Sequence, residues 1–121
     1  MAHSRLSVDQ RHRRGPFDVI GDVHACLTEL DDLFERLDYT QDHTSGWRSP
    51  SGRLPVFVGD LVDRGPSNGD TLDLVRQMVA AEAALVVPGN HDLQLARYLS
   101  HGDAPLVYGL AETMAELQSR P

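Results

Sequence analysis

The sequence predicts an α/β fold: a parallel sheet of about three strands with flanking helices. Two observations support this fold class. Three short apolar runs alternate with segments in which apolar residues recur every three or four positions. In addition, the order is strand, helix, strand, and a helix between two strands lets both strands run in the same direction. The apolar runs should therefore pair in parallel through right-handed crossovers. At 121 residues, the chain is long enough for one domain with its own core.

The predicted strands are the three apolar runs. They cover residues 17–20, 56–58 and 84–87. Each run is rich in β-branched residues and ends in glycine or Pro-Gly. Runs of this kind are typical of buried parallel strands, whose sheet needs cover on both faces. We expect the three or four helices of this chain to cover one face well and the other incompletely.

Helices are predicted between and after these strands. Leu27, Leu30, Leu33, Phe34 and Leu37 would form one apolar stripe. Three further helices are predicted, at residues 67–79, about 91–100 and 110–117. Ser67 is the start signal for the second helix. Residues 40–55 are rich in turn formers, which predicts a surface loop, with a short hairpin as an alternative.

Charge divides the chain into two parts. The formal net charge is −7, so the chain as a whole is not an electrostatic binder of nucleic acid. Residues 1–14, however, contain Arg5, Arg11, Arg13 and Arg14 against the single acid Asp9. We interpret residues 1–14 as a basic, disordered arm, with contact to an anionic polymer as the alternative, and residues 15–121 as the folded domain.

The sequence also indicates a compartment. A single cysteine, Cys26, excludes an internal disulfide framework. No secretory signal follows the N-terminal charges, and no segment is long and apolar enough to cross a bilayer. We therefore expect a cytoplasmic protein with no membrane partner.

Polar motifs follow each predicted strand. Ligand sites of parallel sheets lie beyond the carboxyl ends of the strands. Those positions read "GDVHA" (21–25), "GDLVDRG" (59–65) and "GNHD" (89–92). They bring together four candidate metal ligands, which are Asp22, His24, Asp60 and Asn90.

This set of ligands suits hydrolysis of a phosphoester by two divalent metal ions. Two cations about 3.5–4 Å apart can clamp a phosphoryl group. Asp60 is the candidate to bridge them, because a carboxylate has two oxygens. Oxygen and imidazole ligands favour manganese, with iron, zinc or nickel as alternatives. Asn90 supplies an uncharged amide oxygen and is also expected to contact the anionic substrate.

Three residues beside the metal ligands are candidates for catalysis. The planar fork of Arg64 matches phosphate oxygens. His91 is positioned in the motif to protonate the leaving oxygen, and Asp63 to orient its imidazole.

Each motif also has a structural explanation. Gly-Asp after a strand is usually a turn, and Asn-His-Asp is usually a helix cap. Asp63 and Arg64 alone would be an exposed ion pair of little energetic value. Three strand ends that all carry metal ligands at the same edge favour the functional interpretation.

The three motifs resemble those of the calcineurin-like metallophosphoesterases. Together with "GLAETMAEL" (109–117), they look most like the phosphatase module of bacterial polynucleotide kinase-phosphatase. The resemblance implies half of a four-layer sandwich. It implies that Asp22 and His24 bind one metal ion, that Asp60 bridges both, and that Asn90 binds the second. It also implies a phosphoester substrate at RNA or DNA ends.

Two features of the chain depart from the family pattern. Ala25 stands where the family usually has glycine. The family's two late histidine ligands have no counterpart before Pro121. We therefore expect this chain to be the N-terminal half of the domain, with a complementary C-terminal half as a possible partner.

Three functions remain open from the sequence. The first is hydrolysis of phosphomonoesters or phosphodiesters, at nucleic-acid ends by resemblance. The second is hydrolysis of phosphoproteins or dinucleoside polyphosphates. The third is an inactive fragment or a subunit of a split enzyme.

Overall fold

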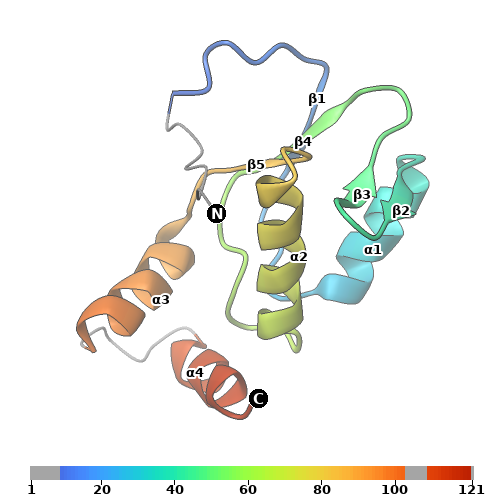
Figure 1. Cartoon of the computed structure of the whole chain (residues 1–121). Helices are drawn as coiled ribbons and strands as arrows, with labels where there is room; N and C mark the ends of the chain where they lie inside the picture. Colours follow the sequence, from blue (N-terminus) through green and yellow to red (C-terminus); the bar gives the residue numbers. More distant parts are fainter. Residues whose placement is uncertain (1–8, 103–108, 121) are drawn as a thin grey trace.

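The sheet has the predicted parallel order. The computed structural model describes residues 9–102 and 109–120 (Figure 1). Its main sheet contains β1 (Phe17–Ile20), β4 (Leu54–Phe57) and β5 (Leu85–Val86), paired in parallel in the order β1-β4-β5. The predicted α/β class is confirmed, and the strands lie within two residues of the predicted runs.

The helices and the hairpin complete the fold. The helices are α1 (Leu27–Arg36), α2 (Asn68–Ala80), α3 (Asn90–His101) and α4 (Leu110–Gln118). All four lie where the apolar periodicity predicted them. The segment between α1 and β4 contains the short antiparallel hairpin of β2 (Thr40–Asp42) and β3 (Gly46–Arg48).

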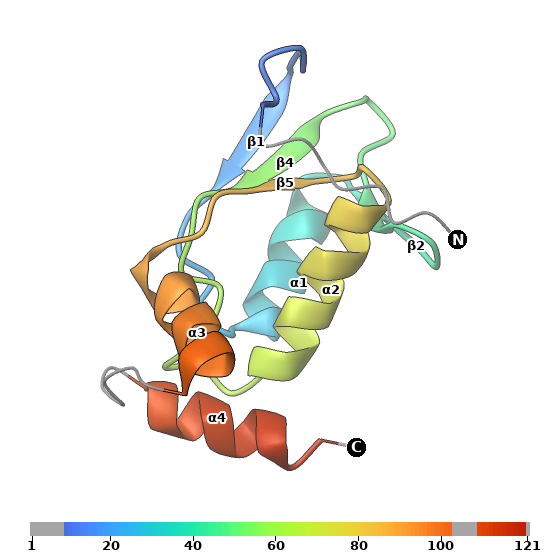
Figure 2. The ribbon, with the colours of Figure 1, turned by 60° about the vertical axis from the view of Figure 1, so that its left-hand side comes forward.

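The described helices bury one face of the sheet. Figure 2 shows α1 and α2 side by side on the same side of the sheet. The core lies between them and includes Phe34, Phe57 and Met78, each fully buried. On the other face, Val19 is 69% exposed and Val87 is 56% exposed. Among the described residues, the helices therefore cover one face well and the other incompletely, as expected for a sheet with so few helices.

The hairpin packs against the core. The Trp47 ring stacks on Phe34 with 5.5 Å between ring centroids, and its indole Nε1 donates a hydrogen bond to Asp31 at 3.0 Å. The apolar ring of Trp47 is thus packed against the core, and its polar Nε1 atom has a hydrogen-bond acceptor. In the described structure, Trp47 therefore secures the hairpin.

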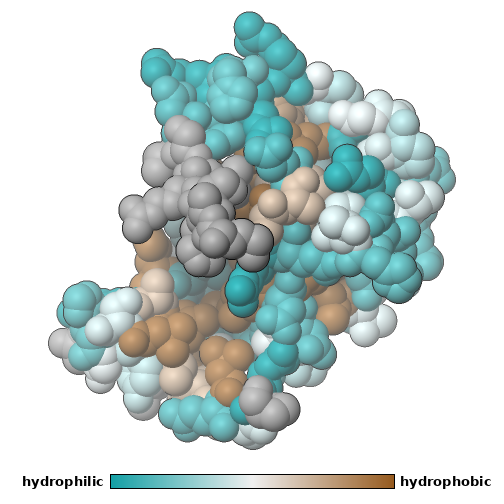
Figure 3. Space-filling view, viewed as in Figure 1, coloured by the Kyte–Doolittle hydropathy of each residue, from teal (hydrophilic) through white to brown (hydrophobic). Residues whose placement is uncertain are grey.

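Two helices extend beyond the carboxyl ends of the strands. Figures 1 and 2 show α3 and α4 at that end of the molecule. Apolar surface gathers over these helices in Figure 3, and Leu93 and Leu99 of α3 are both largely exposed. None of the described helices is long and apolar enough to cross a membrane.

The basic arm is described only in part. Residues 1–8 of the predicted arm lie outside the described residues. Within residues 9–14, the Arg13 amide donates to the Gln10 carbonyl at 2.9 Å, and Arg11 pairs with Asp9. The described part of the arm therefore contains a hydrogen-bonded turn directly before β1.

Candidate active site

Backbone contacts join the loops that follow β1 and β4. The amide of His24 donates to the carbonyl of Asp60 at 2.9 Å, and the amide of Ala25 donates to the carbonyl of Leu61 at 2.8 Å. The amide of Ser67 donates to the carbonyl of Ala25 at 3.0 Å. The first two motifs are therefore a single hydrogen-bonded unit.

Close packing of glycines joins the loops that follow β4 and β5. A Cβ atom at Gly59 would lie 2.8 Å from the Cα of Gly89. One at Gly89 would lie 2.4 Å from the Oδ1 atom of Asp60. Only glycine allows such an approach. The glycines that open the second and third motifs thus bring Asp60 against the start of α3.

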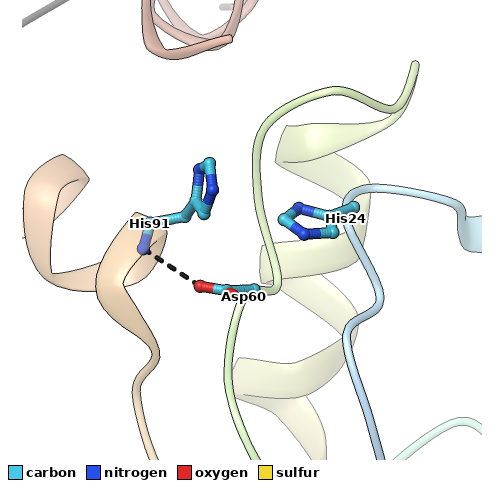
Figure 4. A group of neighbouring side chains, drawn as sticks. All are labelled: His24, Asp60 and His91. Atoms are coloured by element: carbon cyan, nitrogen blue, oxygen red, sulfur yellow. Dashed lines mark hydrogen bonds between the residues drawn. The ribbon is translucent and has the colours of Figure 1, made fainter. Parts of the chain in front are cut away.

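Three side chains converge where the loops meet. His24 comes from the loop after β1, Asp60 from the loop after β4, and His91 from the first turn of α3. One ligand atom from each lies within 4.8 Å of the other two, as Figure 4 illustrates. The His91 amide also donates to Asp60 Oδ1 at 3.0 Å. These residues form a group that can hold a metal ion.

The hydrogen bond of His24 prepares its ring for a metal ion. Its Nδ1 lies 2.9 Å from the carbonyl oxygen of Val62. Because a carbonyl only accepts hydrogen bonds, Nδ1 carries the proton and Nε2 keeps its lone pair. A backbone carbonyl that accepts from the other ring nitrogen commonly orients a metal-binding histidine. His24 can therefore bind a metal ion through Nε2.

Asp22 and Asn90 lie on either side of this group. A carboxylate oxygen of Asp22 is 3.8 Å from the Nε2 atom of His24, and the Asp22 side chain is 61% exposed. The side-chain nitrogen of Asn90 can donate to both carboxylate oxygens of Asp60, at 3.0 and 3.2 Å. Rotating the Asn90 amide by half a turn directs its oxygen to the same place, as metal binding requires. All four predicted metal ligands thus lie at one edge of the sheet.

Asp63 fixes the orientation of His91. Its Oδ2 atom lies 2.7 Å from Nδ1 of His91, and both side chains are buried. An ionised carboxylate only accepts hydrogen bonds, so Nδ1 of His91 is the donor. The residues predicted as acid and orienting partner are therefore in direct contact.

The structure adds two residues around Asp63 that the sequence analysis missed. The Thr113 hydroxyl donates to Asp63 Oδ1 at 2.5 Å, and the Asp63 amide donates to the Asn68 side-chain oxygen at 2.7 Å. Thr113 and Asn68 are both buried. Thr113 lies in the quoted segment "GLAETMAEL", but nothing in that pattern shows that α4 packs against the loop after β4.

Asp92 is a structural residue of the third motif. Its Oδ1 atom accepts from the Leu61 amide at 2.8 Å, and its Oδ2 atom accepts from the Gly89 amide at 2.9 Å. Asp92 therefore caps the start of α3 and ties that helix to the loop after β4. The capping alternative for "GNHD" is right for this residue, whereas Asn90 and His91 face Asp60.

Arg64 points into solvent. Its side chain is exposed, and no described carboxylate forms an ion pair with it. Its backbone has φ of 74°, in the left-handed region. The structure therefore leaves its guanidinium available beside the group, without placing it on a partner.

Comparison with protein-family models gives one match. The model described as calcineurin-like phosphoesterase matches residues 15–117. Known relatives include a bis(5′-nucleosyl)-tetraphosphatase PrpE (asymmetrical) from Halalkalibacterium halodurans, which is 45% identical over 103 residues. That alignment covers 85% of this chain and 42% of the relative. The Bacillus subtilis protein of the same name is 37% identical, with 84% and 41% covered.

A solved structure shows a similar fold. It is a crystal structure of a proposed diadenosine tetraphosphatase, 27% identical in sequence, with a TM-score of 0.59. The match covers 88% of this chain and 38% of that one. The chain thus spans about two fifths of the length of the proteins it matches. These relatives do not support the narrower prediction of a polynucleotide kinase-phosphatase module.

Proposed function

This chain belongs to the calcineurin-like phosphoesterase family, and on that premise we propose that it provides metal ligands and acid–base residues of a hydrolase for phosphoesters. The observation that carries the proposal is the convergence of His24, Asp60 and His91 from three loops at the carboxyl edge of the sheet. The tautomer of His24 and the orientation of His91 both suit that chemistry.

Each ligand has a defined role in the proposal. Asp22 and His24 would hold the first divalent cation, Asp60 would be shared by the two cations, and Asn90 would hold the second. When bound, the two cations would polarise the phosphoryl group and stabilise the charge that develops on it. Imidazole, carboxylate and amide ligands favour manganese, with iron, zinc or nickel as alternatives.

The remaining residues act on the substrate. Asp63 holds His91 through Nδ1, so His91 presents Nε2 to protonate the leaving oxygen. Arg64 binds phosphate oxygens through its exposed guanidinium, and Asn90 contacts the substrate next to the second cation. Thr113 keeps Asp63 in place from behind.

The relatives favour a dinucleoside polyphosphate as substrate. Both named relatives are bis(5′-nucleosyl)-tetraphosphatases. We extend that activity to the protein of which this chain is a part or the whole, in preference to nucleic-acid ends or phosphoproteins. A complementary C-terminal half receives no support from these relatives.

A chain that binds metal without turnover is the second candidate. Among residues 9–102 and 109–120, the proposal assigns the second cation two ligands, Asp60 and Asn90, and the first cation three, Asp22, His24 and Asp60. Binding of one metal ion per chain, without hydrolysis, is the outcome that distinguishes this candidate.

A hydrolysis assay tests the proposal. Purified chain with manganese would be incubated with diadenosine tetraphosphate, a 3′-phosphorylated RNA oligonucleotide, a phosphopeptide and p-nitrophenyl phosphate. We expect diadenosine tetraphosphate to be cleaved fastest, and Asp60→Ala to lower the rate at least about a hundredfold. Asp32→Ala removes an exposed carboxylate of α1 and serves as the matched control. An unchanged rate in Asp60→Ala would refute the assigned mechanism.

A further inference from the structure

A second concave site lies at the opposite edge of the sheet from the candidate active site. It has a volume of about 360 Å³, and its walls come from the segments directly before β1, β4 and β5. Because the three strands are parallel, the segments that precede them meet at one edge, while the loops that follow them meet at the other. This pocket is therefore separated from Asp60 by the length of the strands.

Positive charge is concentrated in the pocket. Four of the chain's 11 basic residues line it, together with His12 and a single acid, Glu82. These four are Arg13, Arg14, Arg48 and Arg53. The chain as a whole has a net charge of −7, so this local excess is opposite in sign to the average. A concave site lined mainly by one sign of charge attracts ions of the other sign.

Two of the arginines form a fixed wall. Arg13 donates to the side chain of Gln10 at 3.0 Å and lies 3.9 Å from the Glu82 carboxylate. Arg53 donates to the carbonyl of Leu37, and its Nε atom lies 3.4 Å from Asp18. These contacts hold both guanidiniums in place before any ligand arrives, which lowers the entropy cost of binding.

The other two arginines are available to a ligand. Arg14 and Arg48 are exposed, and neither forms an ion pair with a carboxylate in residues 9–102 and 109–120. Arg48 makes a long hydrogen bond from its Nε to the Ser45 hydroxyl, at 3.4 Å, and interacts electrostatically with the Asp42 carboxylate. The pocket therefore combines two positioned guanidiniums with two exposed ones that are outside ion-pair distance of these carboxylates.

The lining residues indicate the class of ligand. Arginine forks match phosphate oxygens in pairs, which a point charge does not. Apart from the imidazole of His12, no aromatic ring lines the pocket, so a nucleobase would have nothing on which to stack. We propose that this pocket binds a small polyanion of linked phosphate groups, recognised by its charge and not by a base.

Tripolyphosphate is the probe that tests this proposal. Isothermal titration would be carried out on the whole chain at low salt, with EDTA present to remove metal ions. We expect one tripolyphosphate per chain, and at least a tenfold weaker affinity in the double variant Arg14→Ala/Arg48→Ala. The control Arg36→Ala/Arg76→Ala removes the same charge from exposed positions on α1 and α2. It should change the affinity less than twofold.

Amide NMR of the wild-type chain locates the bound anion without relying on a variant. Shifts are expected at Arg14, Arg48 and Ser49. Shifts confined to the neighbourhood of Asp60 and Arg64 would assign the anion to the candidate active site and overturn the proposal. An equal loss of tripolyphosphate affinity in both double variants would also overturn it, because binding would then depend on the overall charge of the chain and not on the pocket. Loss of hydrolysis in Asp60→Ala has no bearing on this result, so the two proposals fail independently.

Discussion

The loops of the candidate active site hold several non-glycine residues in left-handed backbone conformations. His24 has φ of 45°, Asp60 of 49°, Asp63 of 73° and Arg64 of 74°. Each such residue costs roughly 1–2 kcal/mol. The strain persists because the backbone bond from His24 to Asp60 and the buried contacts of Asp63 fix these conformations. Strained residues of this kind cluster at functional sites, which agrees with the proposed role of these loops.

Ala25 belongs to the same strained group. Its φ is 57°, and its side chain is fully buried. Glycine adopts this conformation without a penalty, which gives a physical reason for the glycine that the resemblance leads one to expect here. The backbone of Ala25 lies against Gly65, since a Cβ atom built on Gly65 would lie 3.0 Å from the Ala25 carbonyl oxygen.

Gly65 is therefore expected to be intolerant of any side chain. A Cβ atom there would lie 1.9 Å from the carbonyl oxygen of His24 and 2.8 Å from the carbonyl carbon of Ala25. Gly65→Ala should lower the free energy of unfolding by about 3 kcal/mol, because backbone cannot move aside as a flexible side chain can. Urea denaturation followed by circular dichroism measures the change.

Gly21→Ala is the matched control for that experiment. Gly21 lies in the first motif, directly after β1, and nothing lies within 4 Å of a Cβ atom built on it. Its free energy of unfolding should stay within about 0.5 kcal/mol of the wild type. Similar losses in Gly21→Ala and Gly65→Ala would contradict the described packing of the first two loops.

Residues that follow a strand were predictable, whereas residues that support them from elsewhere were not. Asp22, Asp60 and Asn90 could be placed together because parallel strands end at one edge. Thr113 lies 50 positions from Asp63 in the sequence and contacts it because α4 packs against the loop after β4. The periodicity of α4 predicts the length of that helix but not the segment against which it packs. A buried threonine on a helix has no sequence signal that separates it from an ordinary packing residue.

At the scale of elements, α4 completes the start of α2. The Glu116 carboxylate accepts hydrogen bonds from the amides of Asn68 and Gly69, at 3.0 and 2.6 Å. Ser67 occupies the N-cap position, as predicted, but its side chain makes no capping hydrogen bond. The Glu116 carboxylate of α4 therefore caps the start of α2, a role that the sequence assigned to Ser67. The positive end of the α2 dipole favours a negative charge at this position.

Glu116→Gln tests this contact between α2 and α4. Burial raises the pKa of the Glu116 carboxyl, but its hydrogen bonds from Gly69 and Asn68 outweigh burial, so the pKa lies below its ordinary value. Glu116 thus stabilises the fold above the unfolded pKa of about 4.3, and that contribution is lost as the pH falls through the lower folded pKa. We expect Glu116→Gln to be less stable than the wild type by about 1–2 kcal/mol at pH 7.

The difference between Glu116→Gln and wild type should narrow as the pH is lowered past 4. Glu112→Gln is the matched control, because Glu112 lies on the same helix and is exposed. Thermal unfolding between pH 3 and pH 7 follows both variants. A difference between Glu116→Gln and wild type that stays constant across this range would rule out a stabilising carboxylate at α2.

At the scale of the whole molecule, the sheet separates a buried face from an open one. Ile20 and Val19 are neighbours in β1 that point to opposite faces, with 6% and 69% of their surface exposed. Ile20→Ala should cost about 2–4 kcal/mol, because it opens a cavity in the core. Val19→Ala should cost under about 1 kcal/mol, because little of its surface is buried. Urea denaturation of the two variants provides the comparison.

Equal losses at Ile20 and Val19 would show that another part of the chain covers the open face. The order of strands and helices was predictable, because short apolar runs alternate in the sequence with segments of period 3.6. Incomplete cover of one face was also expected from the small number of helices, but not which face, since an apolar run looks the same whichever of its sides is covered. Which face of the sheet is covered depends on the face against which α1 and α2 pack, and this is a property of the tertiary structure.

Manganese binding tests the central claim most directly, because it does not depend on turnover. Isothermal titration of the chain with Mn²⁺ should show at least one ion bound per chain. Asp60→Asn should weaken this binding at least tenfold, and the control Asp32→Asn should leave it unchanged. Wild-type affinity in Asp60→Asn, or no bound manganese in the wild-type chain, would contradict a metal centre built from His24, Asp60 and their neighbours.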